Sequence, residues 1–101
     1  MTNEAFEALL ENRIQACRYI LTTKAKEYAG PTDRLWNFKR SAAILGCTPE
    51  EACIGFLTKH LTSIFDMVQS GEWHATPQWD EKIGDAINYL ILLEALVKET
   101  K

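Results

Sequence analysis

The sequence has no long apolar run and no targeting signal at its N-terminus. Its most apolar stretch, residues 83–93, is interrupted by Asp85 and Asn88 and falls short of the roughly 18 residues that a membrane-spanning helix needs. The first residues include no cationic segment ahead of an apolar run, which a signal peptide would require. These absences predict a cytoplasmic protein with no membrane partner.

Paired cysteines are also missing. The three cysteines, Cys17, Cys47 and Cys53, form neither a C-x-x-C motif nor an even set. Disulfide frameworks and structural zinc knuckles usually show one of these patterns. We therefore expect reduced thiols that pack as small apolar groups.

An excess of positive charge is absent as well. The formal net charge is −3, which argues against a protein that coats nucleic acid, because phosphate binding usually leaves a basic face. A local basic patch is still compatible with this balance. With 47% hydrophobic and 25% charged residues, the chain has the composition of one globular domain over residues 1–101.

The spacing of apolar residues predicts four helices and no strand. The first covers about 3–28, with a heptad-like apolar seam that ends before Gly30-Pro31. The second follows Thr32 or Asp33, either of which can cap it, and ends at Gly46. The seam of the first helix comprises Phe6, Leu10, Ile14, Cys17, Leu21, Ala25 and Tyr28. The inward residues of the second are Leu35, Phe38, Ala42 and Leu45.

The third predicted helix has the clearest start. Thr48 at the N-cap, Pro49 at N1 and Glu51 at N3 make a capping box with the preferred proline, and the helix should end near Ser70-Gly71. Its wide apolar face predicts that it is the central helix. That face comprises Cys53, Phe56, Leu57, Leu61, Ile64, Phe65 and Val68.

The fourth predicted helix starts at Thr76-Pro77, which repeats the cap-plus-proline signal, and continues to about Glu99. Its second half is apolar on nearly every side, with Glu94 as the one obvious solvent contact. A small monomer cannot easily cover all of it, so we expect a homo-oligomer, a dimer or larger, that pairs through this helix. An unusually buried central helix is the alternative. Together the elements predict an all-α fold, a compact four-helix bundle.

Two polar stripes and one junction are candidate chemical sites. The junction between the first two helices interleaves cations with aromatic residues, a combination that suits the phosphate and the base of a nucleotide. On the third helix Lys59, Ser63 and Asp66 share a stripe, beside His60. On the fourth, Glu81, Asp85 and Asn88 fall within about 60° of one another at the helical period. The predicted ligand-binding residues are Lys24, Tyr28, Arg34, Trp36, Asn37, Lys59, His60, Asp66, Asp85 and Asn88.

Each of these residues also has a purely structural interpretation. His60 could be a satisfied core histidine, Trp36 could be core, and Asp33 could be only a helix cap. The basic residues of the junction could simply complement the helix ends. Arg34 and Asp85 could form one buried ion pair with no ligand.

Two strings resemble known families. EKIGDAINYLILLEAL (81–96) resembles the second acidic helix of the all-α nucleotide pyrophosphatases of the MazG and dUTPase-like type, where an E-x-x-D holds magnesium. With KAKEYAGPTDRLWNF (24–38) and the final D-x-x-N-Y helix, most of the chain resembles a small, often phage-encoded family named a nucleotide-modification-associated domain. The resemblance implies nucleotide binding, and for a phage-encoded member the host cytoplasm, but a shared fold does not assign a reaction.

The sequence departs from the pyrophosphatase pattern at the metal ligands. A two-magnesium enzyme of this type should offer about four carboxylates. Lys59 and Ser63 stand where the first acidic pair would lie, and Lys82 stands three residues before Asp85. The carboxylates that remain are Asp66, Glu81 and Asp85.

We therefore predict a protein that binds a nucleotide without hydrolysing it and without a cofactor, with sequestration of a host-defence signal as one role. The first alternative is a magnesium-dependent pyrophosphatase in which Asp66, Glu81 and Asp85 hold one ion while Lys59 and Arg34 stabilise the phosphate. The second is an oligomeric helical adaptor without a ligand.

Overall fold

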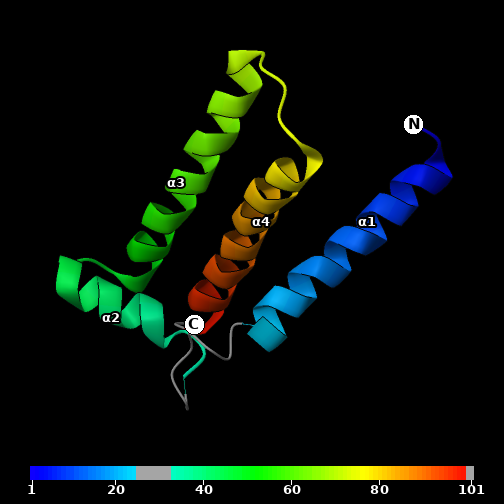
Figure 1. The fold of residues 1–101 in the computed structure, drawn as a ribbon. Coiled ribbons are helices and arrows are strands. Elements are labelled where there is room, and N and C mark those ends of the chain that lie inside the picture. Colours follow the sequence, from blue (N-terminus) through cyan, green and yellow to red (C-terminus); the bar gives the residue numbers. More distant parts are fainter. Residues whose placement is uncertain (25–32, 100–101) are drawn as a thin grey trace.

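The structure is a computed structural model that describes residues 1–24 and 33–99. Within these ranges every regular element is helical, as predicted (Figure 1). The elements are α1 (Asn3–Arg18), the short π-helix η1 (Tyr19–Thr23), α2 (Trp36–Leu45), α3 (Pro49–Ser70) and α4 (Thr76–Glu99). None of the described helices combines the length and the apolar character needed to cross a bilayer.

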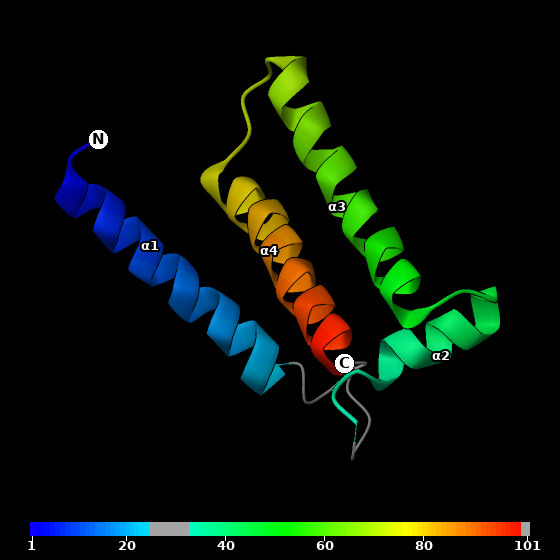
Figure 2. The same cartoon turned by 180° about the vertical axis from the view of Figure 1, so that it is seen from behind.

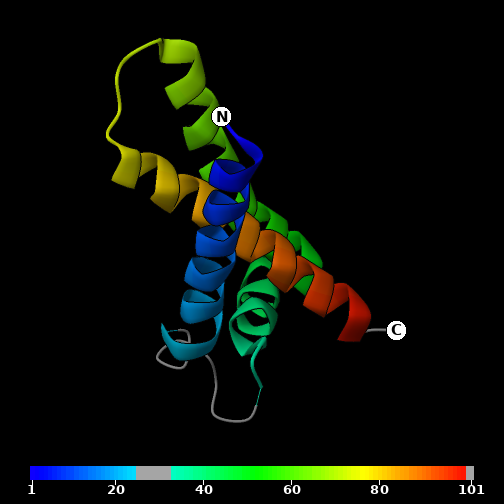
Figure 3. The same cartoon turned by 90° about the vertical axis from the view of Figure 1, so that its right-hand side faces the viewer.

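Of the three long helices, α4 lies in the middle, with α3 on one side and α1 on the other (Figures 1 and 2). The shorter α2 packs against the N-terminal part of α3. Seen from the side, α1 crosses α4 obliquely (Figure 3). The prediction of a central α3 is therefore wrong. The nearly all-round apolar character of α4 lets it pack on two sides at once, whereas α3 uses its apolar face on α2 and α4 only.

The first helix ends earlier than predicted. Its α-helical part stops at Arg18 and widens into the π-turn η1, and positions 25–28 lie outside the described residues. The Thr22 hydroxyl donates to the Arg18 carbonyl at 2.6 Å and so competes for a helix acceptor at this turn. Isolated π-turns of this kind often lie at functional sites.

The buried core lies where α2, α3 and α4 meet. Cys53 and Leu96 are completely enclosed, at 0% and 1% exposure, and the Leu35 and Phe38 side chains complete this cluster. Ala42 is buried as predicted, but Leu45 is 69% exposed. Leu45 is the last residue of α2, next to the turn at Gly46, and its side chain is therefore outside the contact between α2 and α3.

Most of the predicted seam on α1 remains exposed. Cys17 is buried, but Phe6, Leu10 and Ile14 are 55%, 47% and 40% exposed, because α1 packs on α4 alone among the long helices. The radius of gyration is 15.5 Å, against about 13 Å for a compact domain of this length. One chain is therefore more open than the compact bundle that the sequence predicted.

The predicted start of α3 is confirmed and that of α4 is corrected. The Thr48 hydroxyl accepts from the Glu51 amide, and the Glu51 carboxylate accepts from the Thr48 amide, each at 3.1 Å. In contrast, α4 already includes Thr76. The residue before it is Ala75, whose amide donates to the Gln78 side chain at 3.2 Å, so Thr76 is the first helical residue and not the N-cap that the sequence predicted.

Candidate functional site

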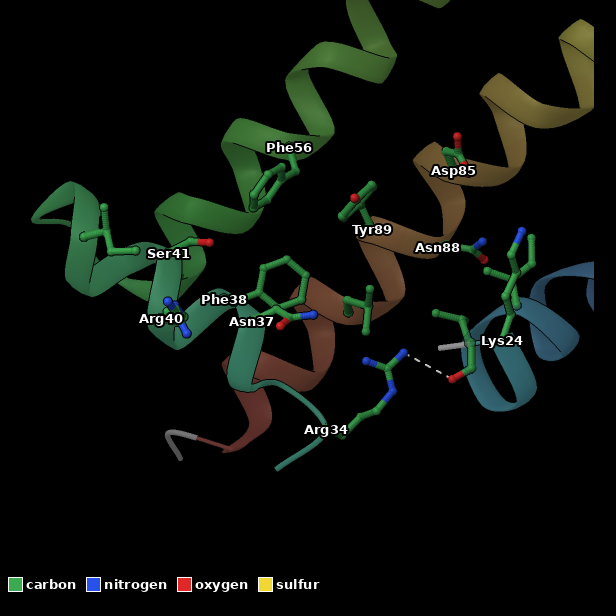
Figure 4. A pocket seen from close by; sticks show the side chains of 14 residues that line it. Lys24, Arg34, Asn37, Phe38, Arg40, Ser41, Phe56, Asp85, Asn88 and Tyr89 are labelled. Atoms are coloured by element: carbon green, nitrogen blue, oxygen red, sulfur yellow. Dashed lines mark hydrogen bonds between the residues drawn. The ribbon is translucent and has the colours of Figure 1, made fainter. Parts of the chain in front are cut away.

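A pocket of about 640 Å³ opens between η1, α2 and α4 (Figure 4). Its volume lies in the range of about 300–1,000 Å³ typical of small-molecule sites. Its polar lining consists of Lys24, Arg34, Asn37, Arg40, Ser41, Asp85 and Asn88. Its apolar and aromatic lining consists of Ile20, Leu21, Phe38, Ile44, Phe56, Tyr89 and Leu92.

Five of the predicted ligand-binding residues meet in this pocket. Lys24 directly follows η1, Arg34 and Asn37 lie at the start of α2, and Asp85 and Asn88 lie one turn apart on α4. The fold thus brings the cationic junction of the sequence against the polar stripe of the fourth helix. The sequence had suggested both features but could not show that they share one cavity.

The other predicted residues do not line the pocket. Trp36 is 41% exposed and lies 5.2 Å beneath the Arg40 guanidinium in a cation–π contact outside the lining. Lys59 and Asp66 are exposed on α3, and Asp66 lies about 15 Å along the helix from Phe56, the α3 residue that reaches the cavity. Tyr28 lies outside the described residues.

His60 lies behind the pocket wall rather than in it. Its Nδ1 is 3.6 Å from an Asp85 carboxylate oxygen, and its ring stacks on Tyr89 with 5.2 Å between centroids. Its side chain is 16% exposed and contacts two lining residues, Asp85 and Tyr89, without being part of the lining itself. His60 is not among the lining residues, and its Nδ1 has no hydrogen bond among the described residues, so the satisfied-core alternative does not hold for this atom. Ligand binding by His60 stays a prediction.

The alternative of an Arg34–Asp85 ion pair is also wrong. The Arg34 guanidinium donates to the Leu21 carbonyl at 3.1 Å, which joins the start of α2 to η1, while Asp85 faces His60. The Arg34 guanidinium therefore lines the pocket, and no carboxylate of the described residues forms an ion pair with it.

Lys39, by contrast, is engaged in structural pairs. Its ammonium lies 2.7 Å from the Asp33 carboxylate and also contacts the Glu99 carboxylate. The hydrogen bond from Lys39 lowers the pKa of Asp33, and the same bond, followed by that to Glu99, raises the pKa of Lys39. Asp33 also accepts from the Leu35 amide at 2.9 Å. However, α2 begins at Trp36 with Leu35 as its N-cap residue and without a side-chain capping bond, so the prediction that Asp33 caps the second helix is wrong.

An aromatic wall lines one side of the pocket, and the sequence pointed to Phe38 in it but not to Phe56 or Tyr89. The rings of Phe56 and Tyr89 stack at 6.0 Å between centroids, and Phe38 meets both edge-on at 6.1 and 6.3 Å. Burial raises the pKa of Tyr89, and the Asp85 charge adds to this effect. Tyr89 follows Asn88 directly and is four residues from Asp85, a signal that could have identified it. Arg40 and Ser41 were missed because each looks like an ordinary surface residue of α2.

Among the described residues that line the pocket, Asn88 is the one buried polar side chain. It is 5% exposed, and its Oδ1 has no hydrogen-bond partner among the described residues. Nearly all buried polar groups in folded proteins are paired, so such an oxygen needs an explanation.

The carboxylates of the enzyme alternative do not assemble. Within the described ranges no group of three or more His, Cys, Asp or Glu side chains is placed to hold a metal ion. Asp66 and Glu81 are exposed, and Asp85 is directed to His60. The predicted magnesium set of these three carboxylates is therefore wrong.

The pocket combines cations, an aromatic wall and a buried amide, which together suit an anionic ligand with a flat polar ring. Comparisons of the chain with protein-family models, with curated protein sequences and with solved structures gave no match. A function for this pocket therefore rests on the chemistry of its own residues.

Proposed function

We propose that this protein binds a nucleotide in the pocket between η1, α2 and α4 and does not hydrolyse it. The proposal rests on one observation, that Lys24, Arg34 and Arg40 line the same cavity as Phe56 and Tyr89. Ammonium and guanidinium groups are the usual partners of phosphate oxygens, and aromatic faces are the usual platforms for bases.

The position of Arg34 supports phosphate binding. Its hydrogen bond to the Leu21 carbonyl uses one N–H of the guanidinium and fixes the group beside the pocket. A positioned guanidinium loses less rotational freedom when it binds a phosphate than a free one does. Lys24 adds a second cation from the neighbouring turn.

The carboxylates support binding without cleavage. Metal-assisted hydrolysis of this type uses several converging carboxylates, and in the described residues Asp85 is the only carboxylate of the lining. A protein that holds a nucleotide intact lowers the free concentration of that nucleotide. We propose on this basis that sequestration of a signalling nucleotide, for example one of a host defence response, is its role.

A thermal-shift screen with mono-, di- and cyclic nucleotides, with and without magnesium, tests the proposal, followed by chromatography of each ligand that shifts the melting temperature. We expect a shift with the ligand recovered intact. Recovery of cleaved ligand would support the pyrophosphatase alternative instead. If no nucleotide shifts the protein, the helical-adaptor alternative is favoured.

Cation variants locate the site. Arg34→Gln and Lys24→Gln should each weaken nucleotide binding roughly 10- to 100-fold in isothermal titration, since each removes a charge-assisted contact to phosphate. Lys98→Gln is the matched control, because Lys98 pairs with Glu94 and its side chain is 74% exposed away from the pocket lining. Equal affinity in all three variants would place the nucleotide elsewhere.

We also propose that a second copy of the chain is a partner. The chain exposes 7432 Å², whereas a monomer of 11.5 kDa exposes about 5,800 Å². The difference of about 1,600 Å² exceeds the roughly 800 Å² that each partner buries in an interface of standard size. On α4, Leu90 and Ile91 are 51% and 46% exposed, and several apolar residues of α1 are similarly exposed. This excess of exposed surface also favours the adaptor alternative if no ligand binds.

A further inference from the structure

We propose that Asn88 recognises the base of the bound nucleotide through a hydrogen bond from a base N–H, so that α4 provides the base-binding side of the pocket. This inference rests on the proposed function and adds to it how the base is distinguished. It begins from Asn88, a residue of the pocket lining that is only 5% exposed. The Oδ1 atom of this side chain has no hydrogen-bond partner among the described residues.

The side chain of Asn88 is placed to meet a ligand. Figure 4 shows its amide on the side of α4 that faces Lys24 and the end of α1, away from the Phe56 side of the pocket. A half-turn about the last side-chain torsion exchanges its oxygen and nitrogen, so the amide can offer an acceptor and a donor side by side. The edges of nucleobases present the same pair of groups in complementary order, and bidentate pairing with an amide is a known form of base recognition.

The Asn88 oxygen and the Asp85 carboxylate make this part of α4 less favourable for phosphate than for a base. Phosphate oxygens are acceptors only, so they gain nothing from the Asn88 oxygen, and the Asp85 carboxylate one turn away repels them. The cations come from other segments, with Lys24 after η1 and Arg34 and Arg40 in or near α2. The ligand is therefore expected to lie with its phosphates on the η1 and α2 side and its base on the α4 side.

The aromatic wall lies in the same pocket but apart from this amide. Figure 4 shows Phe56 and Tyr89 on the side of α4 away from the Asn88 amide. Stacking holds any base, because every base has a π face, whereas the hydrogen bond to a buried amide depends on which groups the base edge presents. The hydrogen bond to Asn88 is therefore the contact that distinguishes one base from another.

The test compares Asn88→Leu with the unmutated protein in isothermal titration against AMP, GMP, CMP, UMP and ribose 5-phosphate, which has no base. We expect the unmutated protein to bind at least one of the four nucleotides more tightly than ribose 5-phosphate. Asn88→Leu should weaken that nucleotide roughly 10- to 100-fold and leave ribose 5-phosphate unchanged. Asn12→Leu, on the exposed surface of α1, is the matched control and should change neither.

The melting temperature of the ligand-free variant gives a second readout. Leucine has nearly the shape of asparagine and removes the unpaired oxygen, so Asn88→Leu should melt at the same temperature as the unmutated protein or higher. A clear fall in the melting temperature would overturn the inference, because it would assign Asn88 a structural bond. A variant that does not fold would have the same meaning.

The unmutated protein tests the inference without any variant. N6,N6-dimethyl-AMP lacks the N–H donors of AMP, and 3-methyl-UMP lacks that of UMP, so at least one methylated ligand should bind more weakly than its parent. If the nucleotides and ribose 5-phosphate bind equally, the base is not recognised and the inference is overturned while the phosphate site stands. If none of the ligands binds, the proposed function fails and the inference fails with it.

Discussion

At the scale of single residues, the pocket shows how a neighbour sets the chemistry of a side chain. Asp85 lies between His60 and the cavity, and Tyr89 stacks on His60 and on Phe56. This cluster fixes Tyr89 in the wall and keeps its phenol neutral over a wider pH range, because burial and then the Asp85 charge raise its pKa. The three helical positions Asp85, Asn88 and Tyr89 therefore act as one surface of α4.

Removal of the Asp85 charge should lower the pKa of Tyr89. In Asp85→Asn the repulsion between the carboxylate and the phenolate disappears, while burial remains, so the pKa should fall but stay above the ordinary tyrosine value. An ultraviolet absorbance titration, with Tyr89→Phe to assign the signal, measures this change. An unchanged titration curve would mean that burial alone sets the pKa.

The Glu51 capping bond should make the start of α3 sensitive to acid. Its hydrogen bond from the Thr48 amide lowers the pKa of Glu51, so the stabilisation is present above the unfolded-state pKa and is lost as the pH falls through the folded-state pKa. Glu51→Gln keeps an acceptor but cannot titrate, so its stability should depend less on pH in this acidic window. Urea unfolding of both proteins between neutral and acidic pH checks the slope, and parallel curves would contradict the prediction.

At the scale of elements, the helices differ in how firmly they are attached. α3 has the more extensive contact with α4, whereas α1 is attached to α4 mainly near one crossing. There the Arg13 guanidinium lies against Gly84 and donates to the Asp80 carbonyl at 3.1 Å. The Arg13 guanidinium can occupy this position because Gly84 has no Cβ atom to collide with it.

Gly84→Ala should loosen α1 without weakening α4. An added Cβ would stand 2.5 Å from the Arg13 guanidinium, which must move and lengthen its bond to Asp80. Hydrogen exchange should therefore become faster in α1 and stay unchanged in α3. Unchanged exchange in α1 would show that Arg13 does not hold the crossing.

Gly55→Ala is the matched control within α3. No atom lies within 4 Å of an added Cβ there, so only the helix preference of alanine acts. We expect a gain of about 0.5–1 kcal/mol in the free energy of unfolding, measured by urea titration. A loss of stability would indicate that a partner covers this face of α3 in solution.

At the scale of the whole molecule, one chain leaves too much apolar surface in water for an isolated domain. The exposed apolar side chains lie mainly on α1, on the outer side of α4 and along α3. Large apolar patches on a folded chain usually mark contacts with other molecules. A second copy of the chain supplies a matching apolar surface and is the partner that we propose.

Leu90→Lys should reduce the oligomer to a monomer. Leu90 is 51% exposed in the single chain, so a lysine there fits the monomer but is costly in an apolar interface. Light scattering after size exclusion should give a mass of two or more chains for the unmutated protein and 11.5 kDa for the variant. Trp73→Lys, at an 86% exposed site in the loop before α4, is the control and should keep the assembly. A monomeric unmutated protein would contradict the proposal.

The sequence alone determined the elements and several of their ends. The capping box at Thr48 and the left-handed turn at Gly46 depend on atoms a few residues apart, so local rules were sufficient. The all-helical fold followed in the same way from the spacing of apolar residues. Lys24, Arg34 and Asp85 were found because their charge or their place in an apolar run is visible in the chain itself.

Only the tertiary structure decided which side chains meet. The pairing of Asp85 with His60, the aromatic wall of Phe56 and Tyr89, and the absence of Lys59 from the pocket depend on how each helix is rotated and where it crosses its neighbours. Those angles result from many small packing contacts between residues far apart in the chain, and no short stretch of sequence contains them. The central place of α4 and the open position of α1 have the same origin.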